Sequence, residues 1–245
     1  MVYQNTIGFN NSIIKIAQLF DASNIWIPSD TSFQQSGVRM PIWESDEKIS
    51  FLSNEGVFLI NQHDSTLNLI SNRRPSHGYD ISIENERVIF SDRDDSSNQL
   101  DDAMIFYKEG FDNTFVFLTR GVFPILVPNK NKFLYETSSE LYISDFNGIT
   151  KSLYKKSDSY YYNSSGKKRI AISPDGISLV ITTSDGVYLI DINSNEIKKL
   201  VGTEYFVPDN WESPSNTSSF VAPIFSSDGT KIFFSITLNE VNFKC

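Results

Sequence analysis

Short apolar stretches alternate with polar turns along most of the chain. The stretches have about four to seven residues, and Asp-Gly, Asn-Gly or similar pairs separate them, as in tight β-hairpins. The clearest example runs from Arg169 to Thr183: an apolar strand, the turn Ser173-Pro-Asp-Gly176, and a second apolar strand. No stretch shows the periodicity of a long amphipathic helix. The pattern predicts an all-β protein.

The same unit repeats along the chain. Residues 169–183 match residues 221–237 almost position for position, and weaker copies lie upstream. The equivalent first-strand positions of the five copies are Ile42, Ile81, Ile125, Ile170 and Ile224. They recur at intervals of roughly 40 to 55 residues, and four short antiparallel strands in a unit of this length are typical of a β-propeller blade. We therefore predict a β-propeller of four-stranded antiparallel blades, with five blades preferred. Six blades, or a fragment of a longer propeller, is the alternative.

Two turns carry a family resemblance. Ser173-Pro-Asp-Gly176 and Ser226-Ser-Asp-Gly229, with a degenerate version at 44–47, resemble the turns of TolB-like, or PD40, propeller repeats. The resemblance extends from about residue 40 onward, and it is closer than that to WD40 repeats, because no Gly-His and Trp-Asp pair is present. It implies that the motif is a structural turn between the inner two strands of a blade. The structural turn residues are then Asp175, Gly176, Asp228 and Gly229, with each Gly in the left-handed conformation.

The two ends of the chain complement each other. The last copy stops after segments 224–226 and 231–238, whereas the N-terminal segment 12–19 resembles an outer strand such as 195–200. We expect residues 1–245 to form a single propeller domain in which the N-terminal strand 12–19 closes the last blade and removes its unpaired edge. The alternative is that the two ends belong to different blades of a longer propeller.

Composition limits the class of partner. With 40% hydrophobic and 13% aromatic residues the chain can bury a sizeable core. Its net charge of −9 argues against nucleic acid or an anionic membrane surface as the main partner. No apolar run reaches the roughly 18 residues that a membrane span needs. No signal peptide is visible in the chain as given, so the localisation is left open; the protein would be periplasmic or secreted if a leader had been removed.

Binding residues are expected on the connections between blades, which emerge together on one face of a propeller. Here these connections, at 20–40, 71–80, 154–168 and 202–220, are the long irregular parts of the chain. Loops on a rigid scaffold often bind partners, and Tyr, Trp and Arg dominate interface energetics. The candidate binding residues are Trp26, Arg73, Arg74, Tyr160, Tyr161, Tyr162, Tyr205 and Trp211. The alternative is that these aromatics pack within their own loops.

Catalytic signals are weak. The two histidines, His63 and His77, and the terminal Cys245 cannot supply a His/Cys metal cluster. The acidic stretch 92–102 lacks the Gly and the closing Glu of a calcium loop. There is no P-loop, dinucleotide fingerprint or Gly-X-Ser-X-Gly elbow. We predict no metal, no cofactor and no catalytic residue.

Function is predicted at the level of binding. The sequence favours a non-catalytic binding module, and the TolB-like resemblance implies that its partner is a protein. The alternative is a carbohydrate-binding or glycoside-hydrolase-type five-bladed propeller, in which loop carboxylates act as acid and base. Such carboxylates are Asp21, Asp30, Asp80, Asp209 and Glu212, and their spacing does not distinguish them from ordinary loop acids.

Overall fold

The described part of the chain is all β. The computed structural model describes residues 2–7, 11–18, 21–26, 39–45, 47–53, 55–61, 63–64, 66–73, 75, 78–82, 86–92, 103–110, 114–155, 169–183, 186–202 and 218–238. These residues form strands and turns, with no helix among them. The predicted fold class is therefore confirmed at the level of secondary structure. In this part of the chain no helix is long and apolar enough to cross a membrane.

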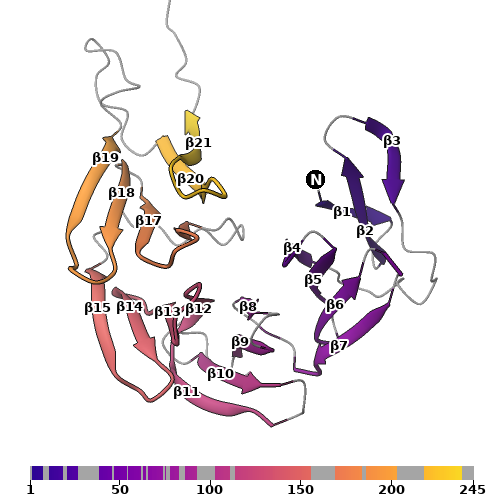
Figure 1. The fold of residues 1–245 in the computed structure, drawn as a ribbon, viewed down its shortest axis with the longest axis horizontal. Coiled ribbons are helices and arrows are strands. Elements are labelled where there is room, and N and C mark those ends of the chain that lie inside the picture. The colour runs from indigo at the N-terminus through magenta and orange to yellow at the C-terminus, as the bar shows by residue number, and fades with distance from the viewer. Residues whose placement is uncertain are drawn as a thin grey trace, which may run out of the picture. The chain divides into compact units, whose positions relative to one another are not determined.

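The strands form antiparallel sheets, each built from one uninterrupted run of sequence (Figure 1). A three-stranded sheet holds β1 (Val2–Ile7), β2 (Asn11–Gln18) and β3 (Asp21–Trp26). Two four-stranded sheets follow. The first contains β4 (Arg39–Trp43), β5 (Lys48–Leu52), β6 (Val57–Asn61) and β7 (Leu67–Ser71). The second contains β8 (Tyr79–Ser82), β9 (Arg87–Asp92), β10 (Met104–Glu109) and β11 (Val116–Arg120).

Two more four-stranded sheets and a two-stranded sheet complete the described part of the chain. The first contains β12 (Val122–Leu126), β13 (Lys132–Glu136), β14 (Glu140–Asp145) and β15 (Thr150–Lys155). The second contains β16 (Ile170–Ile172), β17 (Ser178–Thr182), β18 (Gly186–Asp191) and β19 (Ile197–Gly202). The two-stranded sheet holds β20 (Ser218–Phe225) and β21 (Ile232–Leu238). The chain divides into two compact units, Met1–Leu126 and Val127–Cys245.

The repeat predicted from the sequence matches these sheets. All five isoleucines that mark the copies lie in first strands, namely β4, β8, β12, β16 and β20. One strand was not anticipated: Asp21–Trp26, which the sequence assigned to a long connection, is strand β3. Segment 12–19 corresponds to β2, whose paired neighbours are β1 and β3. Its closure of the last blade, like the number of blades, stays a prediction.

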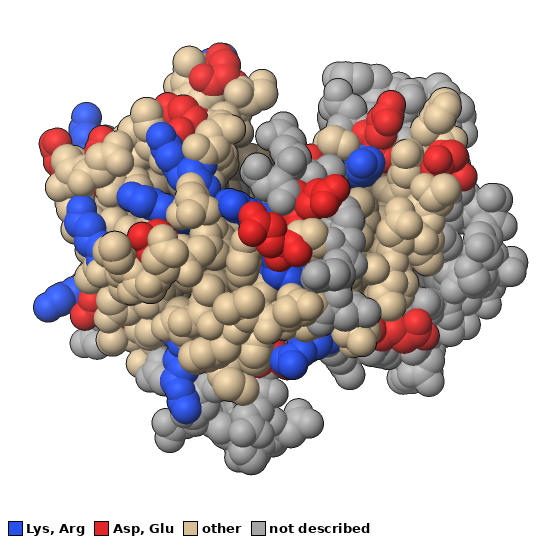
Figure 2. All heavy atoms as spheres, turned by 60° about the horizontal axis from the view of Figure 1, so that its bottom comes forward, with Lys and Arg blue, Asp and Glu red and all other residues tan. Residues whose placement is uncertain are grey.

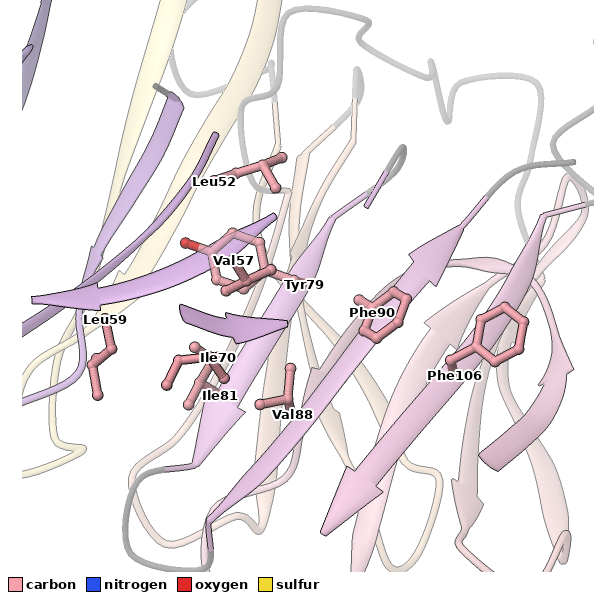
Figure 3. Packing of buried hydrophobic residues seen from close by; sticks show 9 residues of the cluster. All are labelled: Leu52, Val57, Leu59, Ile70, Tyr79, Ile81, Val88, Phe90 and Phe106. Atoms are coloured by element: carbon pink, nitrogen blue, oxygen red, sulfur yellow. The ribbon is translucent and has the colours of Figure 1, made fainter. Parts of the chain in front are cut away.

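A continuous apolar core joins two neighbouring sheets of the first unit. Figure 3 shows the cluster, which comprises Leu52, Val57, Leu59, Ile70, Tyr79, Ile81, Val88, Phe90 and Phe106. The Phe90 and Phe106 rings stack with centroids 5.8 Å apart, and Phe115 meets Phe90 edge-on at 5.4 Å. Each fully buried apolar side chain of this size stabilises the fold by about 1.5 to 3 kcal/mol. The cluster therefore fixes the β4–β7 sheet against the β8–β11 sheet.

The same irregularity recurs in all four of the four-stranded sheets, where the pairing of third and fourth strands shifts by one residue. In β6–β7, for example, Val57 pairs with Ser71 but Phe58 pairs with Leu69, so Ile70 is the extra residue of a β-bulge. The corresponding extra residues are Leu118, Leu153 and Leu200. All four are apolar, and Ile70 and Leu153 are buried. A bulge re-aims side chains and increases the local twist of a sheet. Because the bulge recurs at the same place in each four-stranded sheet, the copies are equivalent in backbone geometry as well as in sequence.

Candidate functional site

Each four-stranded sheet has two distinct ends, because its strands alternate in direction. The turns that join first to second and third to fourth strands lie at one end, which we call the turn end. The turns that join second to third strands lie at the other end, together with the connections to the next sheet. We call this the connection end, and it is where the sequence predicts binding.

Two turns at the turn end are held together by hydrogen bonds from their own side chains. Between β16 and β17, the Ser173 hydroxyl donates to Asp175 Oδ1 at 2.5 Å and accepts from the Ser178 amide at 2.8 Å. Asp175 Oδ1 also accepts from the Ile177 amide at 2.9 Å, and Gly176 has φ +69°. These hydrogen bonds pair the polar groups of the turn with one another, the arrangement that a structural role for Asp175 and Gly176 predicts.

The turn between β20 and β21 repeats this geometry. The Ser226 hydroxyl donates to Asp228 Oδ1 at 2.5 Å, the Thr230 amide and hydroxyl donate to the same oxygen, and Gly229 has φ +72°. These donors, with Ser226 the strongest, hold the pKa of the Asp228 carboxyl down at about 2, and the pKa of Asp175 is lowered in the same way. Both carboxylates are therefore ionised acceptors rather than acid–base groups at neutral pH.

The connection end contains a preorganised arginine. Arg73 follows β7, and its backbone amide donates to the Ser71 hydroxyl at 3.1 Å. Its guanidinium carbon lies 4.5 Å from the centroid of Phe106 and 5.2 Å from that of Phe115. At 3.8 Å from Asp92, the last residue of β9, the guanidinium also forms a long ion pair. Because 41% of the Arg73 side chain is still exposed, the group is held in place while remaining accessible.

A second cation lies behind this arginine. Lys108, in β10, is buried, and its ammonium nitrogen lies 5.5 Å from the centroid of Phe115. Phe115 thus has a guanidinium and an ammonium group near its ring, and the aromatic quadrupole attracts both. Only Arg73 of the two is accessible, so Arg73 is the cation at this position that can meet a partner.

Most of the other predicted binding residues lie outside the described residues. These are Arg74, Tyr160, Tyr161, Tyr162, Tyr205 and Trp211. Trp26 is the last residue of β3, where its backbone pairs with Ile16, and so it lies in a strand rather than in a connection. The sequence identified Arg73 as a candidate, but it gave no signal for Phe106 and Phe115, which come from a different sheet.

Carboxylates do not gather into a catalytic set in the described part of the chain. Asp80, in β8, accepts a 2.7 Å hydrogen bond from the Leu126 amide and so joins two first strands. Asp21 opens β3, whereas Asp30, Asp209 and Glu212 lie outside the described residues, as does His77. No group of three or more His, Cys, Asp or Glu side chains among the described residues could hold a metal ion.

On the face shown in Figure 2, Lys and Arg side chains lie among Asp and Glu side chains and uncharged surface.

Comparison with known proteins identifies the fold. No family model matches the sequence, and no curated protein matches it. Among solved structures, TolB from Acinetobacter baumannii matches with a TM-score of 0.58 and 16% identity, over 98% of this chain and 63% of that one. The chain has the fold of a TolB-like β-propeller. The four-stranded sheets are its blades, and the connections between them are inter-blade connections.

Two further propellers show the range of proteins that share this fold. An oligogalacturonate lyase from Vibrio parahaemolyticus matches with a TM-score of 0.63 and 9% identity, over 91% of this chain and 63% of the lyase. A nidogen/laminin complex matches with a TM-score of 0.55 and 10% identity, over 79% of this chain and 76% of that one. The chain thus spans less than two thirds of the length of both TolB and the lyase.

Proposed function

We propose that this propeller is a non-catalytic binding module whose protein partner docks on the connection end of the blades. The two Asp-Gly turns at the turn end satisfy their own polar groups, whereas the connections carry the Tyr, Trp and Arg residues that favour recognition. The likeness to TolB and to a propeller solved as part of a nidogen/laminin complex supports a role in protein binding.

The accessible, preorganised guanidinium of Arg73 is the observation that carries this proposal. Two aromatic rings hold the group, so little side-chain entropy is lost when a partner binds it. A stacked guanidinium keeps its in-plane N–H donors available for a carboxylate, which it can bind in a bidentate way. Asp92, at 3.8 Å, satisfies this capacity only weakly. The partner is therefore expected to place an Asp or Glu side chain over Arg73.

The experiment compares two arginines that contact the β8–β11 blade: Arg73, which follows β7 at the connection end, and Arg87, in β9 at the turn end. A partner is first recovered from the native cell by cross-linking to the wild-type chain, and its affinity is then measured for Arg73→Lys and Arg87→Lys. Arg87 pairs with Glu109 at the turn end and serves as the matched control. We expect Arg73→Lys to weaken binding by about tenfold, because Lys keeps the charge but loses the fork and the stacking. If Arg73→Lys and Arg87→Lys are both well folded and bind the partner equally well, the docking surface does not include Arg73.

The predicted tyrosines are tested on the same complex. Truncating the best placed of Tyr160, Tyr161 and Tyr162 to Ala should weaken binding by about thirtyfold, the loss typical of a central aromatic anchor. If all three Ala variants bind like the wild type, the connection that carries them does not belong to the interface.

A carbohydrate ligand is the second candidate function. The similar solved structures include oligogalacturonate lyases, and an oligogalacturonate carries carboxylates that a stacked guanidinium could bind. The chain is mixed with oligogalacturonate, and both binding and the release of unsaturated products are measured. We expect neither. Turnover that Arg73→Lys reduces would replace the protein-binding proposal with an enzymatic one.

A further inference from the structure

A groove of about 570 Å³ lies at the turn end of the β4–β7 blade, beside its outer strand. Leu59 and Ile70, both buried, are its apolar floor. Its polar lining includes Lys48, the first residue of β5, and Asn68 of β7. Glu86, from the turn before β9 in the neighbouring blade, also lines it. A volume of this size lies in the range that small-molecule sites occupy, roughly 300 to 1,000 Å³.

The charged side chains of this groove have no ion-pair partner in the part of the chain that the structure describes. Neither Lys48 nor Glu86 forms an ion pair with another described residue. The side-chain amide of Asn68 is also without a hydrogen bond among the described residues. A lysine, a glutamate and an asparagine thus line one groove together with the buried residues Leu59 and Ile70.

Backbone geometry marks Glu86 as unusual: among the described residues it and Phe123 are the positive-φ positions held by neither Gly nor Asn. The φ of Glu86 is +49°, in the left-handed region that L-residues with a long side chain rarely adopt. Two of the other positive-φ positions, Asn129 and Asn195, are occupied by Asn, which tolerates this conformation. Glu has no such advantage, so Gly or Asn would suit the turn better. Residues kept in unfavourable backbone conformations cluster at functional sites, and this one lines a groove.

We propose that the groove binds a short peptide that has both termini free and an apolar side chain. The carboxylate terminus lies at Lys48, the ammonium terminus lies at Glu86, and Asn68 binds the peptide backbone. The apolar side chain covers Leu59 and Ile70. The arrangement favours a zwitterion, because a neutral ligand would leave the charges of Lys48 and Glu86 uncompensated. This site is separate from the docking surface at the connection end, so either proposal can fail without the other.

The test is calorimetric titration of the full chain with tripeptides. The probes are Ala-Leu-Ala, Ala-Val-Ala and Ala-Phe-Ala, each with free termini and each with both termini capped. We expect the free peptides to bind. The capped peptides should bind at least about tenfold more weakly, because a capped peptide loses the charge-assisted hydrogen bonds of both termini. Glu86→Gln and Lys48→Met should each weaken the free peptides by about tenfold. The matched control, Glu196→Gln, changes an exposed glutamate outside the groove and should bind normally.

A second variant separates the role of Glu86 in binding from its role in the turn. Glu86→Gly relieves the left-handed residue and creates an Asn-Gly pair, which favours a tight hairpin. Its thermal midpoint should therefore rise while its peptide affinity falls. The proposal is overturned if no free tripeptide binds, if capped and free peptides bind equally, or if Glu86→Gln keeps wild-type affinity. Preferential binding of a neutral sugar from a parallel panel would also overturn it.

Discussion

Two glycines in equivalent turns allow a controlled measurement of packing at the turn end. Gly176 and Gly229 both follow an Asp, and both have nearly the same left-handed φ, +69° and +72°. Their surroundings differ. A Cβ added to Gly176 would lie 2.4 Å from the Pro128 carbonyl oxygen and 3.1 Å from Val127 Cγ1. A Cβ added to Gly229 would lie 3.5 Å from Pro174 Cδ, an ordinary van der Waals contact.

The two alanine variants should therefore lose different amounts of stability. Gly229→Ala carries only the left-handed penalty, about 1 to 2 kcal/mol. Gly176→Ala carries the same penalty plus the displacement of a neighbouring backbone carbonyl, for which overpacking data suggest about 1 to 3 kcal/mol more. The total for Gly176→Ala is then about 2 to 5 kcal/mol. The difference between the two variants isolates the contact between consecutive turns from the conformational effect.

Urea unfolding is the assay, since both turns lie in the unit Val127–Cys245 and report on the same part of the chain. The free energy of unfolding should fall in the order wild type, Gly229→Ala, Gly176→Ala, with similar m-values. Partner affinity should be unchanged for both variants, because neither turn lies at the connection end. Equal destabilisation would refute the close approach of the turn at Gly176 to the turn between β12 and β13.

Three further predictions concern single polar groups. The folded state lowers the pKa of Asp228 from 3.8 to about 2. Ionised Asp228 therefore stabilises the fold at pH values above 3.8, and this stabilisation is lost as the pH falls toward 2. Over this pH interval the thermal midpoint of Asp228→Asn should fall less than that of the wild type. Asp80→Ala should lower the free energy of unfolding, measured with urea, by about 1 to 3 kcal/mol, because the Leu126 amide loses its acceptor. An unchanged stability would contradict this structural role and would leave an acid–base role for Asp80 to be tested. Burial raises the pKa of the Tyr79 phenol well above 10, so the phenol should stay protonated in an alkaline absorbance titration until the chain unfolds. Tyr79→Phe removes the 3.1 Å hydrogen bond to Ser50 and should lower the free energy of unfolding by about 1 kcal/mol.

Regular features of the fold could be predicted from the sequence, because they depend on local patterns that repeat. The apolar alternation and the Asp-Gly turns located the five first strands, since both act within a few residues. Strand β3 was missed because Asp21-Ala-Ser-Asn24 is polar and lacks the alternation of a half-buried strand. The bulges were missed as well. An apolar pair such as Leu69-Ile70 gives only a weak sign of them, because either residue could be the buried one.

The candidate site was less predictable because its geometry depends on contacts between blades. Arg73 could be selected by residue type and position, but its aromatic partners are separated from it by a whole strand pair in sequence. The groove at Glu86 gave no sequence signal at all. Its polar side chains come from two blades, and a left-handed Glu cannot be recognised from residue type.

The construction of every sheet from one uninterrupted run of sequence has a consequence for how the protein forms. No strand in the described sheets has to wait for a distant segment, so the contacts within each blade are local in sequence. Local contacts favour rapid folding, and an emerging chain folds from its N-terminus. Blades can thus form one after another during synthesis, each providing an apolar surface on which the next one assembles.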